Sequence, residues 1–127
     1  MKKRVHSEHA PAAGGPYSQA IIVNGMVYTA GQVGIDPATG QLVEGGIEEH
    51  THRVIQNVQL VLEAAGSSLD NVVKTTVFLT DINDFAAMNA IYGQYFNTDT
   101  PPARSTIGVA ALPRGAVVEI ETVATVD

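Results

Sequence analysis

The sequence predicts an α+β fold in which two helices cover one face of a mixed β-sheet. Two segments carry apolar side chains at helical spacing, and strand-like runs with alternating side chains come before, between and after them. Each helical segment has one apolar stripe, so the two helices bury one face of a sheet of about five or six strands. The apolar side chains on the other face must also be shielded from water, and self-association of the chain is the simplest way to achieve this.

The N-terminal part predicts a short strand that ends at Val5 and a hairpin made of residues 17–23 and 26–33. Asn24-Gly25 lies between the two apolar runs of this hairpin. This dipeptide favours a tight turn because both positions tolerate a positive φ. Residues 34–46 are rich in glycine and include an Asp-Pro dipeptide, which predicts a loop.

Residues 47–65 predict the longer helix, and Gly66 is its expected C-terminal stop. His50 and His52 lie two positions apart on this helix, so they point to different faces and do not form a metal pair. We expect both histidines on solvated surface. The apolar stripe recurs at spacings of three and four residues and comprises Ile47, Val54, Ile55, Val58, Val61, Leu62 and Ala65.

Residues 71–80 predict a strand, and residues 84–96 predict the second helix, capped by Asp81 or Asn83. The acidic run at this cap lacks the glycine and the distant glutamate of a calcium loop, so capping explains it more simply. One side of the strand comprises Val73, Thr75, Val77 and Leu79. The apolar face of the helix comprises Phe85, Met88, Tyr92 and Tyr95.

A closing hairpin is predicted from a strand over 105–112, a turn at 113–115 and a strand over 116–126. Arg104 begins the first strand, directly after Pro-Pro-Ala. The second strand alternates, so Val118, Ile120, Thr122 and Ala124 share one face, and Val117, Glu119, Glu121 and Val123 share the other. A charged side chain in an otherwise apolar strand costs free energy unless it is paired with an opposite charge or has a functional role. We therefore predict that this hairpin carries the functional residues.

Three residues each allow a structural and a functional interpretation. Arg104 is either a surface residue or a guanidinium positioned for bidentate carboxylate binding. Glu119 is either a solvated carboxylate on an edge strand or a base that acts on water. Gly31 is either a strand end with close backbone approach or an amide that donates to a ligand carboxylate.

Composition excludes several classes of site and partner. The chain has no cysteine, which excludes disulfides, thiol nucleophiles and thiolate metal sites. Its net charge of -6 argues against nucleic acid as a main partner, because phosphate binding needs basic patches. The length predicts one domain over residues 1–127. No apolar run is long enough for a membrane span, and none follows the basic N-terminus, which predicts a cytoplasmic protein.

Five blocks, in order along the chain, resemble the RidA family, also called YjgF. They are residues 10–20, 29–37, 72–85, 102–106 and 118–121, and their order and spacing extend the resemblance over essentially the whole chain. The resemblance implies a chorismate-mutase-like α+β fold. It also implies a homotrimer with pockets in the clefts between subunits.

The same resemblance implies an activity, that of a 2-iminobutanoate/2-iminopropanoate deaminase. Such an enzyme hydrolyses reactive enamine and imine intermediates, of the 2-aminoacrylate and 2-aminocrotonate type, to 2-keto acids and ammonia. The implied ligand is the small imine or its 2-keto acid, and neither a cofactor nor a metal is expected.

The resemblance also implies roles for individual residues. Arg104 matches the arginine that binds the substrate carboxylate, Gly31 the glycine whose backbone supports it, and Glu119 the glutamate that positions or activates water. The other implied pocket residues are Tyr17, Asn89 and Thr106. Thr106 stands where a cysteine is common in bacterial members, and Ala30 where a serine is common, which leaves substrate preference and rate open.

Two other functions stay open at this point. One is a ribonuclease or translation inhibitor, an activity attributed to some relatives, although the net charge and the lack of a paired histidine site argue against it. The other is a non-enzymatic ligand-binding or holdase-like trimer that uses the same pocket.

Overall fold

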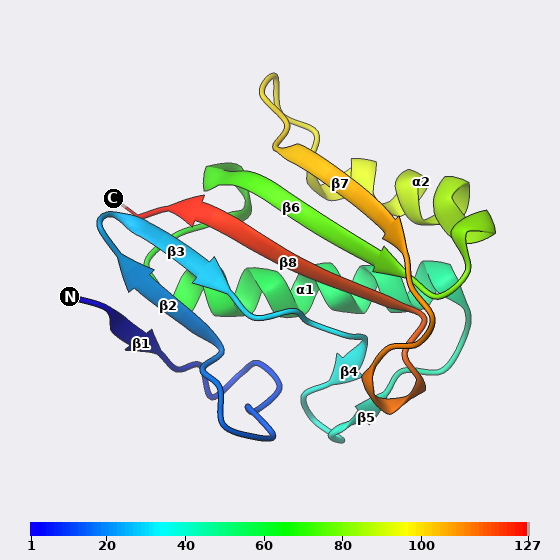
Figure 1. Cartoon of the computed structure of the whole chain (residues 1–127), viewed down its shortest axis with the longest axis horizontal. Helices are drawn as coiled ribbons and strands as arrows, with labels where there is room; N and C mark the ends of the chain where they lie inside the picture. The colour runs from blue at the N-terminus through cyan, green and yellow to red at the C-terminus, as the bar shows by residue number, and fades with distance from the viewer. Residues whose placement is uncertain (127) are drawn as a thin grey trace.

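The computed structural model describes residues 1–126 (Figure 1). Its strands and helices are β1 Lys3–Val5, β2 Ala20–Val23, β3 Met26–Thr29, β4 Ile35–Asp36, β5 Gln41–Leu42, α1 Ile47–Ala64, β6 Val72–Leu79, α2 Phe85–Tyr95, β7 Ala103–Gly108 and β8 Val118–Thr125. The main sheet has six strands in the order β1-β2-β3-β8-β6-β7, and both helices lie on one of its faces (Figure 1). The predicted α+β class is confirmed.

The core lies between this sheet and α1, and the predicted helix stripe forms its centre. Val54, Ile55, Val58, Val61 and Leu62 are all at most 1% exposed. Each such side chain contributes about 1.5–3 kcal/mol through removal of apolar area from water. They pack in one cluster with Val118, Ile120 and Ala124 of β8.

The second helix follows its predicted stripe only in part. Met88 and Tyr92 are buried as expected, but Phe85, in the first position of the helix, is 39% exposed. Ile91 is buried instead. Asp81 does act as a cap, because its carboxylate accepts the Asn83 N–H at 2.9 Å in the short 3-10 turn before α2.

The predicted closing hairpin is wrong, since β6 lies between β7 and β8 (Figure 1). The β6–α2–β7 segment is a crossover that makes β7 parallel to β6. β8 then enters between β3 and β6 and is antiparallel to both. Residues 109–117, which join β7 to β8, pass the end of β6, so proximity in the sequence did not make these two strands neighbours in the sheet. The strand predicted over 105–112 also ends at Gly108.

The predicted alternation is also wrong for one β6 residue. Val73 was predicted to share one side of the strand with Thr75, Val77 and Leu79, but those three are buried and Val73 is 45% exposed. The pairing register with β8 shifts between Val72 and Lys74. This irregularity inserts an extra residue, so Val72 is buried in place of Val73.

The N-terminal hairpin is shorter than predicted, because β2 begins at Ala20 and β3 ends at Thr29. Before β2, the Gln19 side chain is occupied with the chain upstream: its Oε1 accepts from Ser7 N at 2.6 Å, and its amide donates to Pro11 O at 2.9 Å. After β3, Gln32 still pairs with Ile120 of β8 as a single bridge. The predicted loop at 34–46 contains the small β4–β5 sheet.

The placement of His50 differs from the expectation. It is buried at 7% exposure, and its Nδ1 has no hydrogen-bond partner among residues 1–126. The cause is the backbone of Gly34, against which the imidazole packs. His52 is half-buried, and its Nδ1 lies 2.8 Å from the Tyr95 hydroxyl.

The sheet face away from the helices carries both charged and large apolar side chains. Glu119, Glu121 and Val123 of β8 point to this face, because their neighbours in the strand are buried in the core. Tyr28 lies opposite Val123 and is 47% exposed. Ile107 on β7 lies on the same face and is 44% exposed. These side chains form the surface for which a further cover was predicted.

Gly34→Ala tests the packing against His50. An added Cβ would lie 3.1 Å from His50 Nδ1 and 3.3 Å from its Cα, so the packing between position 34 and His50 must loosen by a few tenths of an ångström. We expect a loss of about 1–3 kcal/mol in the free energy of unfolding, measured by urea denaturation. Gly14→Ala is the control, since an added Cβ there meets nothing within 4 Å. Equal stability of the two variants would contradict the packing described.

Candidate active site

Three of the residues implied by the family resemblance line one pocket. Tyr17, Gly31 and Glu119 surround a hollow of about 250 Å³. It is formed by the segment before β2, the segment after β3, the start of β8 and the turn before β8. The remaining lining residues are Ala12, Gly14, Val33, Ile35, Pro113 and Arg114.

Gly31 and Glu119 are in direct contact, which explains the glycine. A Cβ at position 31 would lie 2.7 Å from the Glu119 Cδ and still closer to Oε2. The backbone cannot retreat easily, because Gln32 N donates to Ile120 O at 2.9 Å and Ile120 N donates to Gln32 O at 3.1 Å. A side chain at position 31 would therefore push the Glu119 carboxyl out of its present place, which supports the interpretation as close backbone approach.

The Gly31 N–H also differs from those of its neighbours. Ala30 N donates to Gln19 O at 2.8 Å, and Gln32 N donates to Ile120 O. Among residues 1–126, no backbone acceptor is found for the Gly31 N–H. The amide is thus available next to the Glu119 carboxylate.

The Glu119 carboxyl is half-buried, and burial raises its pKa above the ordinary value. The neighbouring carboxylate of Glu121 raises the pKa further through like-charge repulsion. A carboxylate with a raised pKa is a better proton acceptor near neutral pH than an ordinary one. The two glutamates therefore differ: Glu121 is exposed, whereas Glu119 lines the pocket.

Tyr17 lines the same hollow from a tight turn before β2. Its hydroxyl accepts the Gly14 N–H at 3.2 Å, and its backbone N–H donates to Gly15 O at 2.8 Å. These contacts orient the side chain, although Tyr17 is 56% exposed.

Arg104 does not line this pocket. In the β6–β7 register it is opposite Thr75, whose buried side chain faces the helices. Its guanidinium carbon lies 4.6 Å from the ring centroid of Tyr92 and 5.4 Å from that of Phe85. Glu119 is opposite Phe78 on β6. Thr75 and Phe78 are three positions apart, so Arg104 and Glu119 point to opposite faces of the sheet.

Thr106 and Asn89 belong with Arg104. Thr106 is two positions from Arg104 on β7, so it shares the same face, opposite buried Val77. Asn89 is exposed on α2, four positions after Phe85 and therefore on the Phe85 side of that helix. The chain thus holds the implied site residues in two separate groups.

Further residues that contact Arg104 or line the Glu119 pocket were not among the predicted site residues. Tyr92 and Phe85 were assigned only to the core stripe, yet they form the aromatic surface under Arg104. The Tyr92 hydroxyl is 2.7 Å from Thr75 Oγ1, which fixes the ring. Their spacing of seven residues, close to two helical turns, was the available signal. Arg114 was assigned only to a turn, but it lines the Glu119 pocket.

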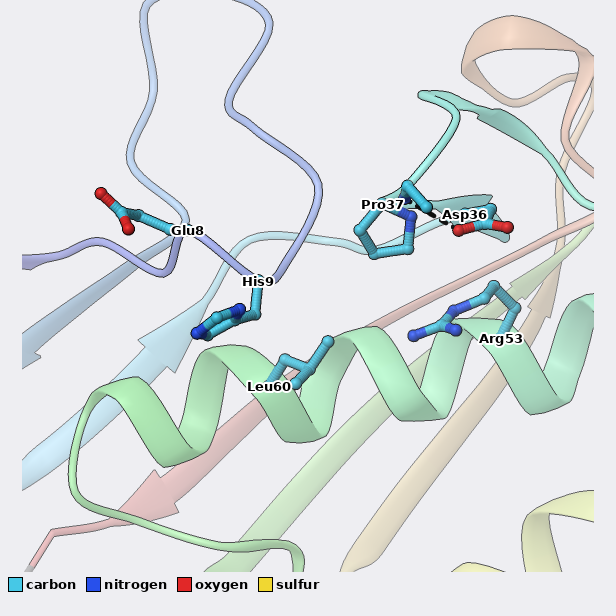
Figure 2. A pocket seen from close by; sticks show the side chains of 7 residues that line it. Glu8, His9, Asp36, Pro37, Arg53 and Leu60 are labelled. Carbon is cyan, nitrogen blue, oxygen red and sulfur yellow. Dashed lines mark hydrogen bonds between the residues drawn. The ribbon is translucent and has the colours of Figure 1, made fainter.

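A larger hollow, of about 500 Å³, lies along α1 and contains none of the predicted site residues. Figure 2 shows Arg53 and Leu60 on the helix, His9 on a loop and Asp36 at the end of β4. Arg53 Nε donates to Asn57 Oδ1 at 3.0 Å. Within residues 1–126, no group of three or more His, Asp or Glu side chains is placed to hold a metal ion. In the same part of the chain, neither helix has the length and apolar character needed to cross a membrane.

A family model described as Endoribonuclease L-PSP matches residues 7–126. The chain belongs to the RidA/YjgF family. Its similarity extends over nearly the full length of its relatives. A RutC family protein of Synechocystis is 53% identical over 96% of this chain and 95% of its own length. The 2-iminobutanoate/2-iminopropanoate deaminase of Homo sapiens is 49% identical over 98% of this chain and 90% of its own length.

Solved structures of RidA-family proteins share the whole fold. YyfA of Yersinia pestis, a member of the conserved Rid family, matches with a TM-score of 0.96 at 50% identity, over 99% of this chain and 100% of its own. TdcF of E. coli, whose structure contains bound serine, matches with a TM-score of 0.93 at 38% identity, over 98% of this chain and 99% of its own.

Glu119→Gln tests the raised pKa in this RidA-family chain. A carboxyl whose folded-state pKa is raised contributes stability below its unfolded pKa and loses it as the pH rises through the folded value. We therefore expect the wild type to lose stability relative to Glu119→Gln as the pH rises from about 4 towards neutrality. Urea unfolding at a series of pH values measures the difference.

Glu121→Gln serves as the partner variant in this experiment. It removes the neighbouring charge and leaves the Glu119 carboxyl in place. Relative to Glu119→Gln, the Glu121→Gln variant should therefore still lose stability as the pH rises, but by less than the wild type does. A difference between wild type and Glu119→Gln that is independent of pH would contradict the assigned environment.

Proposed function

We propose that this protein is a hydrolytic deaminase that converts small reactive 2-imino acids, and the enamines that tautomerise to them, to 2-keto acids and ammonia. The observation that carries the proposal is the pairing of the half-buried Glu119 carboxylate with the available Gly31 amide in one pocket. The deaminase name of the human relative at 49% identity supports it.

The chemistry requires water, a proton acceptor and orientation. The imine carbon is already electrophilic. Water adds to the protonated imine as Glu119 accepts one proton of that water, and a neutral carbinolamine forms. Glu119 then returns this proton to the nitrogen and accepts the hydroxyl proton as the C–N bond breaks, which yields the keto acid and ammonia. Ammonia takes up the last proton and leaves as ammonium, so the Glu119 carboxylate is regenerated. A positioned general base contributes about 10²–10⁴-fold, and orientation of the two reactants contributes several kcal/mol more.

Arg104 is proposed to hold the substrate carboxylate. Its guanidinium rests on two aromatic rings, which favour the cation and restrict its motion. Bidentate pairing with a carboxylate suits this planar group. The serine bound in TdcF is likewise a small molecule with a carboxylate, which supports a ligand of this class.

A complete site then needs a second copy of the chain. Arg104 and Glu119 point to opposite faces of one sheet, so one chain cannot direct both at a single small molecule. We propose a homotrimer in which Tyr17, Gly31 and Glu119 come from one subunit and Arg104, Thr106 and Asn89 from its neighbour. The apolar side chains on the uncovered sheet face support this assembly. A cytoplasmic location is part of the same proposal.

A coupled assay tests the reaction. A serine or threonine dehydratase supplies the intermediate, and keto-acid release is followed with and without this protein. We expect acceleration by the wild type and a loss of at least about a hundredfold in kcat/KM for Glu119→Gln, because the base is removed. Arg104→Ala should lower kcat/KM by about tenfold or more, mainly through KM.

Glu63→Gln and Arg4→Ala are the matched controls, since both residues are exposed and neither lines the pocket. Both controls should stay close to wild type. Full activity of Arg104→Ala, or no acceleration by the wild type, would refute the proposal.

Mixed trimers test the shared site. Arg104→Ala and Glu119→Gln subunits are each defective, but a mixture creates interfaces that combine an intact Arg104 with an intact Glu119. Random mixing in equal amounts should restore about one quarter of the wild-type sites. Activity after co-refolding, compared with that of separately refolded trimers, measures the effect. If both residues acted from one chain, no activity would return.

A ribonuclease is the second candidate, favoured by the name of the matching family model. The net charge of -6 opposes it. RNA cleavage by purified protein, tested without added metal, distinguishes it from the deaminase. A protein that binds 2-keto acids but accelerates neither reaction would instead support the ligand-binding or holdase-like alternative.

A further inference from the structure

The Glu119 pocket contains a cation to which neither the sequence analysis nor the family resemblance assigned a role. Arg114 lines this pocket from the short 3-10 turn at Pro113–Gly115. Its backbone has φ 63° and ψ 16°, a left-handed conformation that is uncommon for a residue with a side chain. Proline before it and glycine after it, with φ 73° at Gly115, support this turn.

Within residues 1–126, one donor of the Arg114 side chain is anchored by a hydrogen bond. Nη2 donates to the carbonyl oxygen of Gly40 at 2.8 Å, in the loop between β4 and β5. A guanidinium has five N–H groups in a fixed fork, so the others stay available to a ligand. Glu119 does not neutralise it: the pKa of Glu119 is raised by burial and by Glu121, whereas a guanidinium in contact would lower it.

A second hollow, of about 240 Å³, adjoins the first one. It is lined by Pro11, Ala12, Ile35, Pro37, Gly40 and Arg114. Ala12, Ile35 and Arg114 line both hollows, so Arg114 lies at the boundary between them. A ligand that reaches from Glu119 into the second hollow passes this guanidinium.

We propose that Arg114 forms an anion subsite beside the Glu119 pocket and favours 2-imino acids whose side chain ends in a second carboxylate. The inference rests on the proposed deaminase function and adds its substrate class. Arg104 of the neighbouring subunit would hold the carboxylate next to the imine carbon, and Arg114 the distal one. The acidic substrate gains a charge-assisted contact at Arg114 that a neutral aliphatic substrate lacks.

Relative kinetics on two substrates test the subsite. An amino-acid oxidase supplies the imine of glutamate or of 2-aminobutanoate, and keto-acid release is followed for the wild type, Arg114→Gln and Arg114→Lys. We expect Arg114→Gln to lower the ratio of kcat/KM for the acidic imine over the neutral one by about tenfold or more, mainly through KM. Arg114→Lys should retain part of the ratio, because it keeps the charge but loses the fork.

If Arg114 had a purely structural role, such as holding the Gly40 loop, Arg114→Gln would lower kcat/KM equally for both imines. The ratio of the two values would then equal that of the wild type. That result would overturn the inference. Arg53→Gln is the control, since this arginine also makes a hydrogen bond inside its own chain but lines a different hollow. A change of the ratio in Arg53→Gln as large as in Arg114→Gln would overturn it as well.

Equilibrium binding separates this inference from the proposed function. Calorimetry with 2-oxoglutarate and 2-oxobutanoate measures the subsite without catalysis. We expect Arg114→Gln to weaken 2-oxoglutarate binding about tenfold more than 2-oxobutanoate binding. If the wild type hydrolyses neither imine but this difference is found, the deaminase proposal fails and the anion subsite stands. If the neutral imine is hydrolysed and the difference is absent, the subsite alone fails.

Discussion

The pleat that runs across β8, β6 and β7 constrains how a site can be built in this protein. Side chains directly opposite each other on neighbouring strands share a face, and successive ones alternate. Glu119 is opposite Phe78, and Arg104 is opposite Thr75, so the two charged groups diverge. A register slip of one residue would bring them together but would also expose the β8 side chains that fill the core. Core packing and an intrachain site are therefore incompatible here, which is the strongest argument for a site between subunits.

Each half of the proposed site has its own physical support. On one side, the bare backbone of Gly31 allows the Glu119 carboxylate to approach, and the paired Gln32 and Ile120 amides hold that approach in place. On the other side, Tyr92 is buried and its hydroxyl is fixed by Thr75, so the ring is a rigid surface for Arg104. In both halves the charged group is partly removed from water and positioned by a neighbour that is itself immobile. Such preorganisation lowers the cost of binding a small charged ligand.

Local patterns predicted the elements well and their neighbours poorly. The stripe of α1 is confirmed because its spacing depends only on helical geometry, and the β8 alternation is confirmed because a strand has a period of two. The prediction that the last two strands form a hairpin is wrong, because the crossover through α2 places β7 on the outer side of β6. No local pattern in the sequence encodes that placement. The predictions for Val73 and His50 were wrong for related reasons. A single extra residue inverted the exposure of Val73, and the approach of Gly34 buried His50.

The sequence by itself determined the α+β class, the two helices, the faces of β8 and, through its family blocks, the candidate residues, since each of these depends on short-range periodicity or on an ordered set of motifs. Only the tertiary structure decided which candidates share a space. It joined Tyr17, Gly31 and Glu119, separated them from Arg104, and placed Arg114 of the predicted turn in the pocket wall. The reason is that strand order and register are set by the packing of the whole core, and a shift of one strand changes the neighbours of every side chain on it.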